Sequence, residues 1–443
     1  MSATKKPMLG QIKEKLIQQS LEKRLSAIGT ERPKAAPAGK IPEAHWRFDQ
    51  QPGYRQVELI RQGAQRLGAS SPFFHVHEGI AGARTHIAGH SLLNFANYNY
   101  LDLSGHPAVQ QAAKEAIDRY GSSVSASRIV AGERPLHRDL EQGLARWYGV
   151  EDALVLVSGH ATNVGVIGHL LGPRDLILHD AYAHNSIVLG AQLSGAQRLS
   201  FPHNDVGALE ELLSQHRHRA ERTLIVVEGL YSMDGDFPNL PALIELKNRF
   251  QTWLMVDEAH SLGVLGRNGH GIAEHFTVNP RQVDIWMGTL SKTLASCGGF
   301  VAGEQALIDN LRYLAPTFLY SVGLAPPLAA AALAALQILQ DEPERVQRLQ
   351  ENGQYFLEHA RAVGLDTGSS AGFAISPVIL GSSLRCVRAA EALMQRGVHV
   401  QPILYPAVPE KQARLRFFLS SAHTQQDIDQ SIHETQEVLN KVL

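Results

Sequence analysis

The chain has 443 residues, of which 44% are hydrophobic and 19% are charged, and its formal net charge is -2. A near-neutral chain of this length can bury large cores in two or three lobes, and it lacks the surplus of basic residues that binding to nucleic acid or to an acidic membrane requires. With two cysteines, Cys297 and Cys386, it has no disulfide framework, and a reducing cytoplasm is the expected location.

The first 50 residues predict a helix followed by a linker. Apolar side chains recur at near-helical spacing through residues 8–25, at Leu9, Ile12, Leu16 and Leu21, which indicates one amphipathic helix. Residues 27–44 are rich in Ala, Pro and Gly and are typical of a linker. The segment has no uncharged core of signal-peptide length, and no run in the chain reaches the roughly 18 apolar residues of a membrane span.

From about residue 90 onward, apolar runs of strand length alternate with helical patterns. The runs are ALVLV (153–157), LILH (176–179), TLIVVE (223–228), WLMVDE (253–258), DIWMG (284–288) and GGFVAG (298–303). Runs without polar alternation fit strands that are buried on both faces, and the intervening lengths suit crossover helices. The pattern predicts an α/β fold, with a mostly parallel sheet covered by helices on both sides.

The C-terminal part predicts a smaller α+β lobe. An apolar helix at 327–340 is followed by strand-like PVIL (377–380), HVQPIL (399–404) and LRFFLS (415–420), and then by a helical C-terminus. We expect four parts along the chain: the helix and linker over 1–50, an N-terminal arm over 51–105, a large lobe over 106–325 and a small lobe over 326–443.

Polar side chains follow five strands of the predicted large sheet, where each strand ends. They are the turn SGHATN (158–163), His184, Ser232, the pair Asp257 and His260, and the pair Thr289 and Lys292. Each segment alone suits a plain turn, a cap or a surface loop. Because ligand sites of parallel sheets gather at the carboxyl ends of the strands, the five together predict one site.

This set of groups matches the needs of pyridoxal phosphate. The cofactor aldehyde needs an amine, its pyridine nitrogen needs a carboxylate that keeps it protonated, and its phosphate needs N–H and hydroxyl donors. Lys292, Asp257 and the SGHATN turn with Thr289 supply them. Burial favours a neutral imine over an ammonium group, which accounts for a lysine at such a position. The 21 histidines show no HExxH or comparable spacing, so we expect no metal site.

The chain resembles the α-oxoamine synthases, a family of fold-type I pyridoxal phosphate enzymes that includes 8-amino-7-oxononanoate synthase and serine palmitoyltransferase. The resemblance covers roughly residues 75–440. Within the family, the chain is most similar in character to members found with polyketide and fatty-acid assembly lines. It is carried by NYNYLDLSGHP, SVSASRIVAGERPLHRDLE, SGHATN, EGLYSMDGD, MVDEAHSLGVLG, GTLSKTL and ARLRFFLSSAHT. It implies a large domain with the mostly parallel sheet and a smaller C-terminal α+β domain.

The resemblance also implies roles for the residues at the centre of the site. Lys292 would form the Schiff base with the cofactor and act as the catalytic acid and base. Asp257 would pair with the pyridine nitrogen, while Ser232 and His260 would hold the phenolic oxygen of the ring. His184 would stack on the ring face and help to orient the acyl thioester.

Further residues would bind the phosphate and the amino acid. The backbone amides of Gly159 and His160 would hold the phosphate together with the Thr289 hydroxyl. Ser321 would reach the phosphate across a dimer boundary, although YSVGLAPP keeps only this serine of the hydroxyl and amide groups usual there. Arg416 would clamp the amino acid carboxylate, and Asn99 is a weaker candidate for contact with substrate.

By this resemblance, the protein would condense a small amino acid (glycine, alanine or serine) with an acyl thioester, carried by coenzyme A or by an acyl carrier protein. The products would be an α-aminoketone, thiol and carbon dioxide, and the family implies a homodimer with shared sites. An aminotransferase or an aldolase-type lyase of the same fold type is the nearest alternative. A noncatalytic partner subunit is a further alternative, although such subunits typically lack the lysine that stands here at Lys292.

Overall fold

The computed structural model describes residues 41–66 and 71–442, and the chain divides into two compact units between Phe74 and His75. The helix predicted over 8–25 and most of the predicted linker lie outside the described residues. The first unit contains two 3-10 turns, η1 (Glu43–His45) and η2 (Phe48–Gln50), and the helix α2 (Pro52–Arg66).

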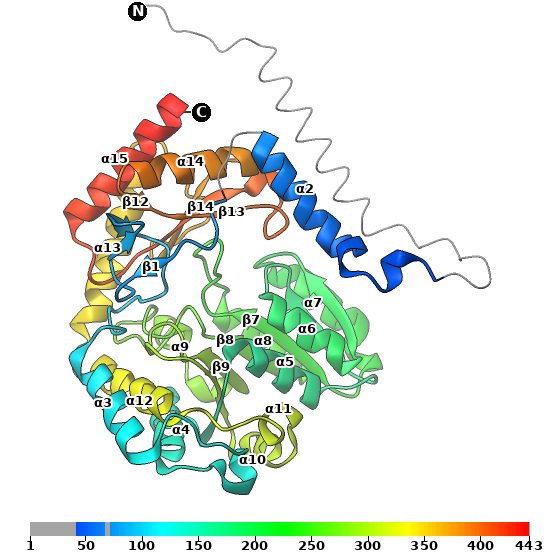
Figure 1. The fold of residues 1–443 in the computed structure, drawn as a ribbon. Coiled ribbons are helices and arrows are strands. Elements are labelled where there is room, and N and C mark those ends of the chain that lie inside the picture. Colours follow the sequence, from blue (N-terminus) through cyan, green and yellow to red (C-terminus); the bar gives the residue numbers. More distant parts are fainter. Residues whose placement is uncertain (1–40, 67–70, 443) are drawn as a thin grey trace, which may run out of the picture. The chain divides into compact units, whose positions relative to one another are not determined.

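The second unit is built on a seven-stranded sheet in the order β4-β10-β9-β8-β7-β5-β6 (Figure 1). The strands are β4 (Asp152–Leu156), β5 (Leu176–Asp180), β6 (Gln197–Phe201), β7 (Thr223–Glu228), β8 (Trp253–Asp257), β9 (Ile285–Thr289) and β10 (Gly299–Gly303). β10 runs antiparallel to both of its neighbours, whereas the pairs from β9 through β8, β7 and β5 to β6 are parallel. The predicted mostly parallel sheet is confirmed.

The strands of this sheet are apolar throughout because both faces are covered. In β7, Ile225 and Val227 belong to one hydrophobic core, while Leu224 and Val226 belong to a second core on the opposite face. This division follows from the strand period of two, which sends alternate side chains to opposite faces. The edge strand β6, Gln197–Phe201, carries mostly exposed side chains and no apolar run, so the sequence pattern did not indicate it.

Two groups of helices supply the covering layers. The core behind one face takes side chains from α5 (Gly159–Leu170), α6 (Asn185–Ser194), α10 (Gln305–Leu314) and α11 (Pro316–Leu319). The core on the other face takes them from α3 (Pro107–Tyr120), α4 (Pro135–Tyr148), α7 (Val206–His216), α8 (Leu240–Phe250) and α12 (Pro326–Asp341), and the short α9 (Ile272–His275) joins it. α12 is the apolar helix predicted at 327–340, which is confirmed.

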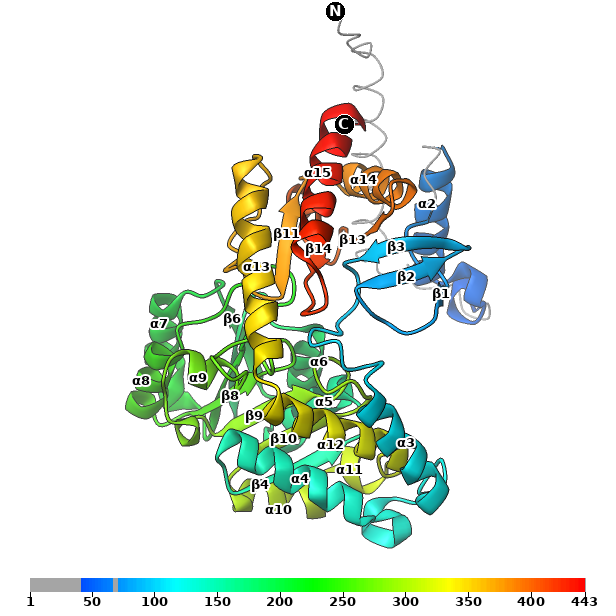
Figure 2. The same ribbon diagram turned by 90° about the vertical axis from the view of Figure 1, so that its left-hand side faces the viewer.

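The small lobe combines C-terminal strands with an N-terminal hairpin (Figure 2). Its elements are α13 (Glu344–Ala362), β11 (Ile375–Ile379), α14 (Ser383–Gln395), β12 (Val398–His399), β13 (Gln401–Ile403), β14 (Arg414–Phe418) and α15 (Gln425–Val442). β11, β14 and β13 form an antiparallel sheet. In a second sheet, β1 (His77–Glu78), β2 (Arg84–Ile87) and β3 (His90–Asn94) join β12, because Leu93 pairs with Val398.

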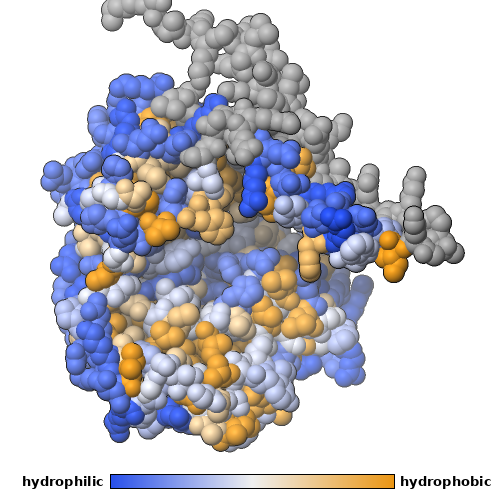
Figure 3. Space-filling view, in the orientation of Figure 1, coloured by the Kyte–Doolittle hydropathy of each residue, from blue (hydrophilic) through white to orange (hydrophobic). Residues whose placement is uncertain are grey.

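Hydrophobic side chains gather on one face over α10 and α11 (Figure 3). We call the following exposed residues of this region the apolar patch: Ile129, Val130, Tyr313, Leu314, Tyr320 and Val322. The two segments that form the patch, 129–130 and 313–322, are neighbours, because the Gly323 N–H donates to the Ala126 carbonyl. Within the described ranges, no helix combines the length and the apolar character that crossing a membrane requires.

Candidate active site

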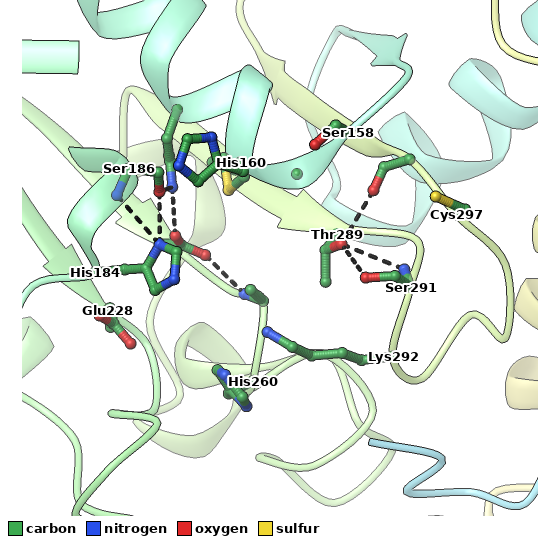
Figure 4. Close-up of a pocket in the computed structure, with 16 residues that line it drawn as sticks. Ser158, His160, His184, Ser186, Glu228, His260, Thr289, Ser291, Lys292 and Cys297 are labelled. Carbon is green, nitrogen blue, oxygen red and sulfur yellow. Dashed lines mark hydrogen bonds between the residues drawn. The ribbon is translucent and has the colours of Figure 1, made fainter. Parts of the chain in front are cut away.

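The strand ends of the large sheet surround a cavity of about 250 Å³ (Figure 4). Its walls come from the chain after β4, the start of α6, the last residues of β7 and β8, and the loop between β9 and β10. The structure therefore brings most of the predicted residues together around one cavity: Gly159, His160, His184, Asp257, His260, Thr289 and Lys292.

Asp257 ends β8 as a buried carboxylate with a hydrogen bond to each oxygen. The Asn163 side-chain amide donates to Oδ2 over 2.8 Å, and the Ala259 backbone N–H donates to Oδ1 over 2.9 Å. Donors of this kind stabilise the charged form of a carboxyl group. Asp257 can therefore keep a negative charge in a site where only 4% of the residue is exposed.

Lys292 extends from the loop after β9 into the cavity (Figure 4). Burial lowers the pKa of its amine to about 8, although the charge of Asp257 acts in the opposite direction. Its Nζ atom lies 5.6 Å from the centre of the Tyr98 ring. A pKa near 8 leaves part of the amine neutral at physiological pH, so Lys292 can accept a proton.

Two of the three imidazoles that line the cavity, those of His184 and His260, are held in place by neighbouring hydroxyl groups. His184 caps the start of α6, and its Nδ1 lies 2.7 Å from the Ser186 hydroxyl. His260 Nδ1 lies 2.7 Å from the Tyr100 hydroxyl. Burial lowers the pKa of both rings, most strongly that of His260, and the positive charge of Lys292 acts in the same direction. Both are therefore expected to be neutral near pH 7.

One hydrogen-bonded chain connects the carboxylate with an imidazole. The same Asn163 amide nitrogen that donates to Asp257 also donates to the Ser186 hydroxyl over 2.9 Å, and Ser186 contacts His184. Asn163 Oδ1 is buried and has no hydrogen-bond partner among the described residues. These contacts fix the relative positions of the two groups, since movement of either breaks a buried hydrogen bond.

The turn after β4 forms a narrow cradle beside Thr289. Ser158 caps the start of α5, and its hydroxyl accepts a hydrogen bond from the Ala161 N–H. A Cβ atom at Gly159 would lie 2.8 Å from Thr289 Oγ1, which excludes larger side chains there. The N–H groups at this helix start suit an anion. The Thr289 hydroxyl beside them donates to the Gly298 carbonyl over 3.0 Å and contacts the Ser291 hydroxyl.

Arg416 lies on β14 of the small lobe as a buried guanidinium. Its Nη1 donates to the Ser232 carbonyl over 3.1 Å, and its Cζ lies 4.5 Å from the centre of the Phe418 ring. Its Nε is buried without a hydrogen-bond partner in the described part of the chain. Burial lowers its pKa, yet an arginine with such contacts stays protonated, and the unused donor suits a carboxylate.

Besides Arg416, three predicted residues lie away from the cavity wall. Ser232 contacts Arg416 through its carbonyl. The Asn99 side chain stabilises the local backbone. Its Oδ1 accepts a hydrogen bond from the Leu103 N–H over 2.8 Å, and its Nδ2 donates to the Ala81 carbonyl over 2.6 Å. Ser321 is half-buried beside the apolar patch, and its hydroxyl donates to the Val322 carbonyl. The structure does not bring these side chains to the other site residues.

Other residues of the site were missed by the sequence analysis. Asn163 is the last residue of the SGHATN motif, so the sequence could have indicated it as a site residue. Glu228 is the last letter of the run TLIVVE, where it reads as the end of a strand. Tyr100 reaches His260 from 160 positions away in the chain, and Ser186 reaches Asn163 across 23 positions. Such contacts depend on the folded arrangement.

Comparison with known proteins agrees with this arrangement. Residues 90–434 match the aminotransferase class I and II family. The 8-amino-7-oxononanoate synthase of Thermosipho melanesiensis is 40% identical over 365 residues, which cover 82% of this chain and 93% of that protein. The corresponding synthase of Symbiobacterium thermophilum is 40% identical over 349 residues, which cover 79% of this chain and 88% of that protein.

Solved structures with this fold include members of the same group. Serine palmitoyltransferase of Sphingomonas wittichii superposes with a TM-score of 0.84 at 28% identity, covering 88% of this chain and 97% of that one. The 8-amino-7-oxononanoate synthase of Francisella tularensis superposes with a TM-score of 0.69 at 28% identity, covering 80% of this chain and 99% of that one. The predicted fold-type I architecture is confirmed. The chain belongs to the pyridoxal phosphate-dependent aminotransferase class I and II family and, within it, to the α-oxoamine synthases.

Proposed function

We propose that the protein condenses a small amino acid with an acyl thioester and releases an α-aminoketone, thiol and carbon dioxide. One observation carries this proposal: a single cavity places the amine of Lys292 near the hydrogen-bonded carboxylate of Asp257 and the anion cradle at Gly159. The names of the relatives support it, because they are 8-amino-7-oxononanoate synthases and serine palmitoyltransferases.

The residues present fit pyridoxal phosphate. A side chain at position 159 would collide with Thr289, so glycine keeps the cradle open. The cradle offers donors for the phosphate. Asp257, charged and doubly hydrogen-bonded, would hold the protonated pyridine nitrogen, and Lys292 would bind the cofactor covalently. When bound, the cofactor supplies an electron sink for the pair of electrons left at the amino acid Cα.

The protein's own groups can then transfer the proton, bind the substrate carboxylate and orient the thioester. Lys292, with its lowered pKa, accepts the Cα proton. Arg416 offers its unused Nε donor to the amino acid carboxylate. His260, fixed by Tyr100, would hold the ring oxygen, and neutral His184 would orient the thioester.

We further propose that two copies of the chain share their sites. The apolar patch exposes large side chains, including Val130 at 79% and Tyr320 at 86%, and patches of this kind mark interaction surfaces. Ser321 lies between Tyr320 and Val322 of this patch. A second copy seated on the patch would bring Ser321 to the boundary between subunits, where the resemblance places its contact with a phosphate.

The test is a panel of glycine, alanine and serine against acyl-coenzyme A and acyl-carrier donors, with release of free thiol as the readout. The proposal predicts thiol release that requires both substrates and disappears in Lys292→Ala together with the visible absorption of the bound cofactor. Normal activity of purified Lys292→Ala would reject the assignment of this lysine.

The same panel separates the alternatives. An aminotransferase would form a keto acid, and an aldolase-type lyase would form an aldehyde, each without release of thiol. A noncatalytic partner subunit would show no cofactor absorption that borohydride removes. The panel also decides which amino acid and which carrier are used, since these candidates differ by few atoms within one cavity.

A further inference from the structure

Glu228 forms a second buried carboxyl group beside Asp257. It is the last residue of β7, and in the parallel pair of β7 with β8 it stands directly opposite Asp257. Only 3% of the residue is exposed, and it lines the cavity next to His184 (Figure 4). Two carboxyl groups at paired positions of neighbouring strands cannot both ionise cheaply, because their charges repel in a site with little water.

The surroundings decide which of the two carries the charge. Asp257 receives a hydrogen bond on each oxygen, from Asn163 and from Ala259. Glu228 Oε1 is buried and has no hydrogen-bond partner among the described residues. The anion is therefore better stabilised on Asp257, and the proton belongs on Glu228.

The other groups around Glu228 do not reverse this distribution. Burial has the largest effect and raises the pKa of Glu228 well above its usual value, and the charge of Asp257 acts in the same direction. Lys292, from the loop after β9, acts against this shift, as do backbone hydrogen bonds from His184 and Ser232. Tyr231 packs nearby with a raised pKa of its own and stays neutral.

We propose that Glu228 is a further catalytic residue of this site, which meets the bound ligand as a neutral carboxylic acid and donates a hydrogen bond to a ligand oxygen on which negative charge develops. The proton stays on Glu228 throughout, so no bond is made or broken by this residue. This role rests on the proposed condensation for the identity of the ligand. A buried acid that lines the cavity and keeps an unused polar atom is suited to it, because a preorganised donor in a dry site stabilises charge strongly.

Kinetics of two variants test the donor role. Glu228→Gln keeps a donor of similar shape, so kcat should stay within about threefold of the wild type, whereas Glu228→Ala should lose about 100-fold in kcat with a smaller change in KM. The alkaline decline of kcat that ionisation of Glu228 causes should be absent from Glu228→Gln. Equal losses in the two variants would overturn the proposal, because they would show that the carboxylate itself is needed.

Infrared spectroscopy of the holoenzyme tests the protonation state without turnover. The carbonyl band of a protonated carboxylic acid should be present at about pH 7 and absent from Glu228→Gln. Glu258→Gln is the matched control, because burial also raises the pKa of Glu258, to about 7, and its own carbonyl band must be told apart from that of Glu228. The assigned band should persist in this control. A wild-type spectrum that Glu228→Gln leaves unchanged would overturn the proposal even if Glu228→Ala fails to fold.

The proposed condensation and the neutral state of Glu228 are rejected by different results. A band that Glu228→Gln removes, with no release of thiol from any substrate pair, would reject the condensation and support the neutral state of Glu228. Normal release of thiol, with no such band, would support the condensation and reject the neutral acid.

Discussion

The charge of the site depends on Asn163, a residue that contacts two functional groups. Its amide nitrogen donates to Asp257 and to Ser186, which in turn contacts His184. Asn163 is a positioning residue because it acts through these neighbours. It keeps Asp257 ionised and thereby favours the proton on Glu228.

Replacing Asn163 with leucine should therefore remove one of the two hydrogen bonds that stabilise the carboxylate of Asp257. A hydrogen bond to a charged group contributes about 1.5 to 3 kcal/mol, so kcat should fall by about 10-fold to 100-fold. The acidic limb of the pH profile, followed by the visible absorption of the bound cofactor, should move to higher pH.

The same exchange at the exposed Asn248 of α8 is the control and should change neither quantity. An acidic limb that stays in place in Asn163→Leu would contradict the assigned role.

The chemically distinctive residues of the site could be predicted from the sequence because each follows a strand that is visible as an apolar run. Lys292, Asp257 and Thr289 are of this kind, and the structure places them around one cavity. Glu228 was missed because a polar residue at the end of an apolar run reads as its boundary. Tyr100 was missed because only folding brings it to His260.

The loop after β7 connects the two lobes and positions Arg416. Arg414 of β14 pairs with Asp234 of this loop over 2.6 Å and donates to the Met233 carbonyl, while Arg416 donates to the Ser232 carbonyl. These contacts attach the small lobe to the edge of the large sheet where the cavity lies.

A charged histidine secures the same loop. His203 lies between Asp180 and Asp236, with its Nδ1 at 2.9 Å from the first and its Nε2 at 3.0 Å from the second. Burial acts to lower the pKa of His203, but the hydrogen bonds and negative charges of the two aspartates outweigh it and raise the pKa to about 10. Because the folded pKa exceeds the unfolded value of about 6.5, this stabilisation is complete below about pH 6.5 and is lost as the pH rises through 10.

His203→Gln should accordingly be less stable than the wild type by about 2 kcal/mol near pH 6.5, and the difference should shrink toward pH 10. Urea unfolding of both proteins across this range measures it. A difference that stays constant with pH would show that the charge of His203 contributes nothing to stability.

Local patterns predicted the elements better than their pairing. Apolar runs in the sequence predict the buried strands and the helix at 326–341. The antiparallel direction of β10 and the pairing of β3 with β12, more than 300 positions apart, depend on contacts that no local pattern records. The edge strand β6 was missed because one of its faces meets solvent.

The apolar patch is the surface on which the proposed dimer depends. Arg128 stands with its guanidinium 5.2 Å from the centre of the Phe318 ring and anchors the turn that carries Ile129 and Val130. A second copy would cover these side chains.

A charge at the patch should separate the subunits. Val130→Asp should elute as a monomer in gel filtration and lose most activity, since burying an unpaired carboxylate in an interface is costly. Val363→Asp places the same charge on an exposed apolar residue of the small lobe and should leave the dimer intact. A wild-type protein that is active as a monomer would contradict the proposed sharing of sites.

The decisive measurement follows carbon dioxide and thiol in the same reaction, with an amino acid labelled at its carboxyl carbon and the acyl thioester that the panel selects. Decarboxylative condensation predicts equal amounts of labelled carbon dioxide and free thiol, both absent from Lys292→Ala. Labelled carboxyl carbon retained in a keto acid, or carbon dioxide released without thiol, would contradict the proposed reaction.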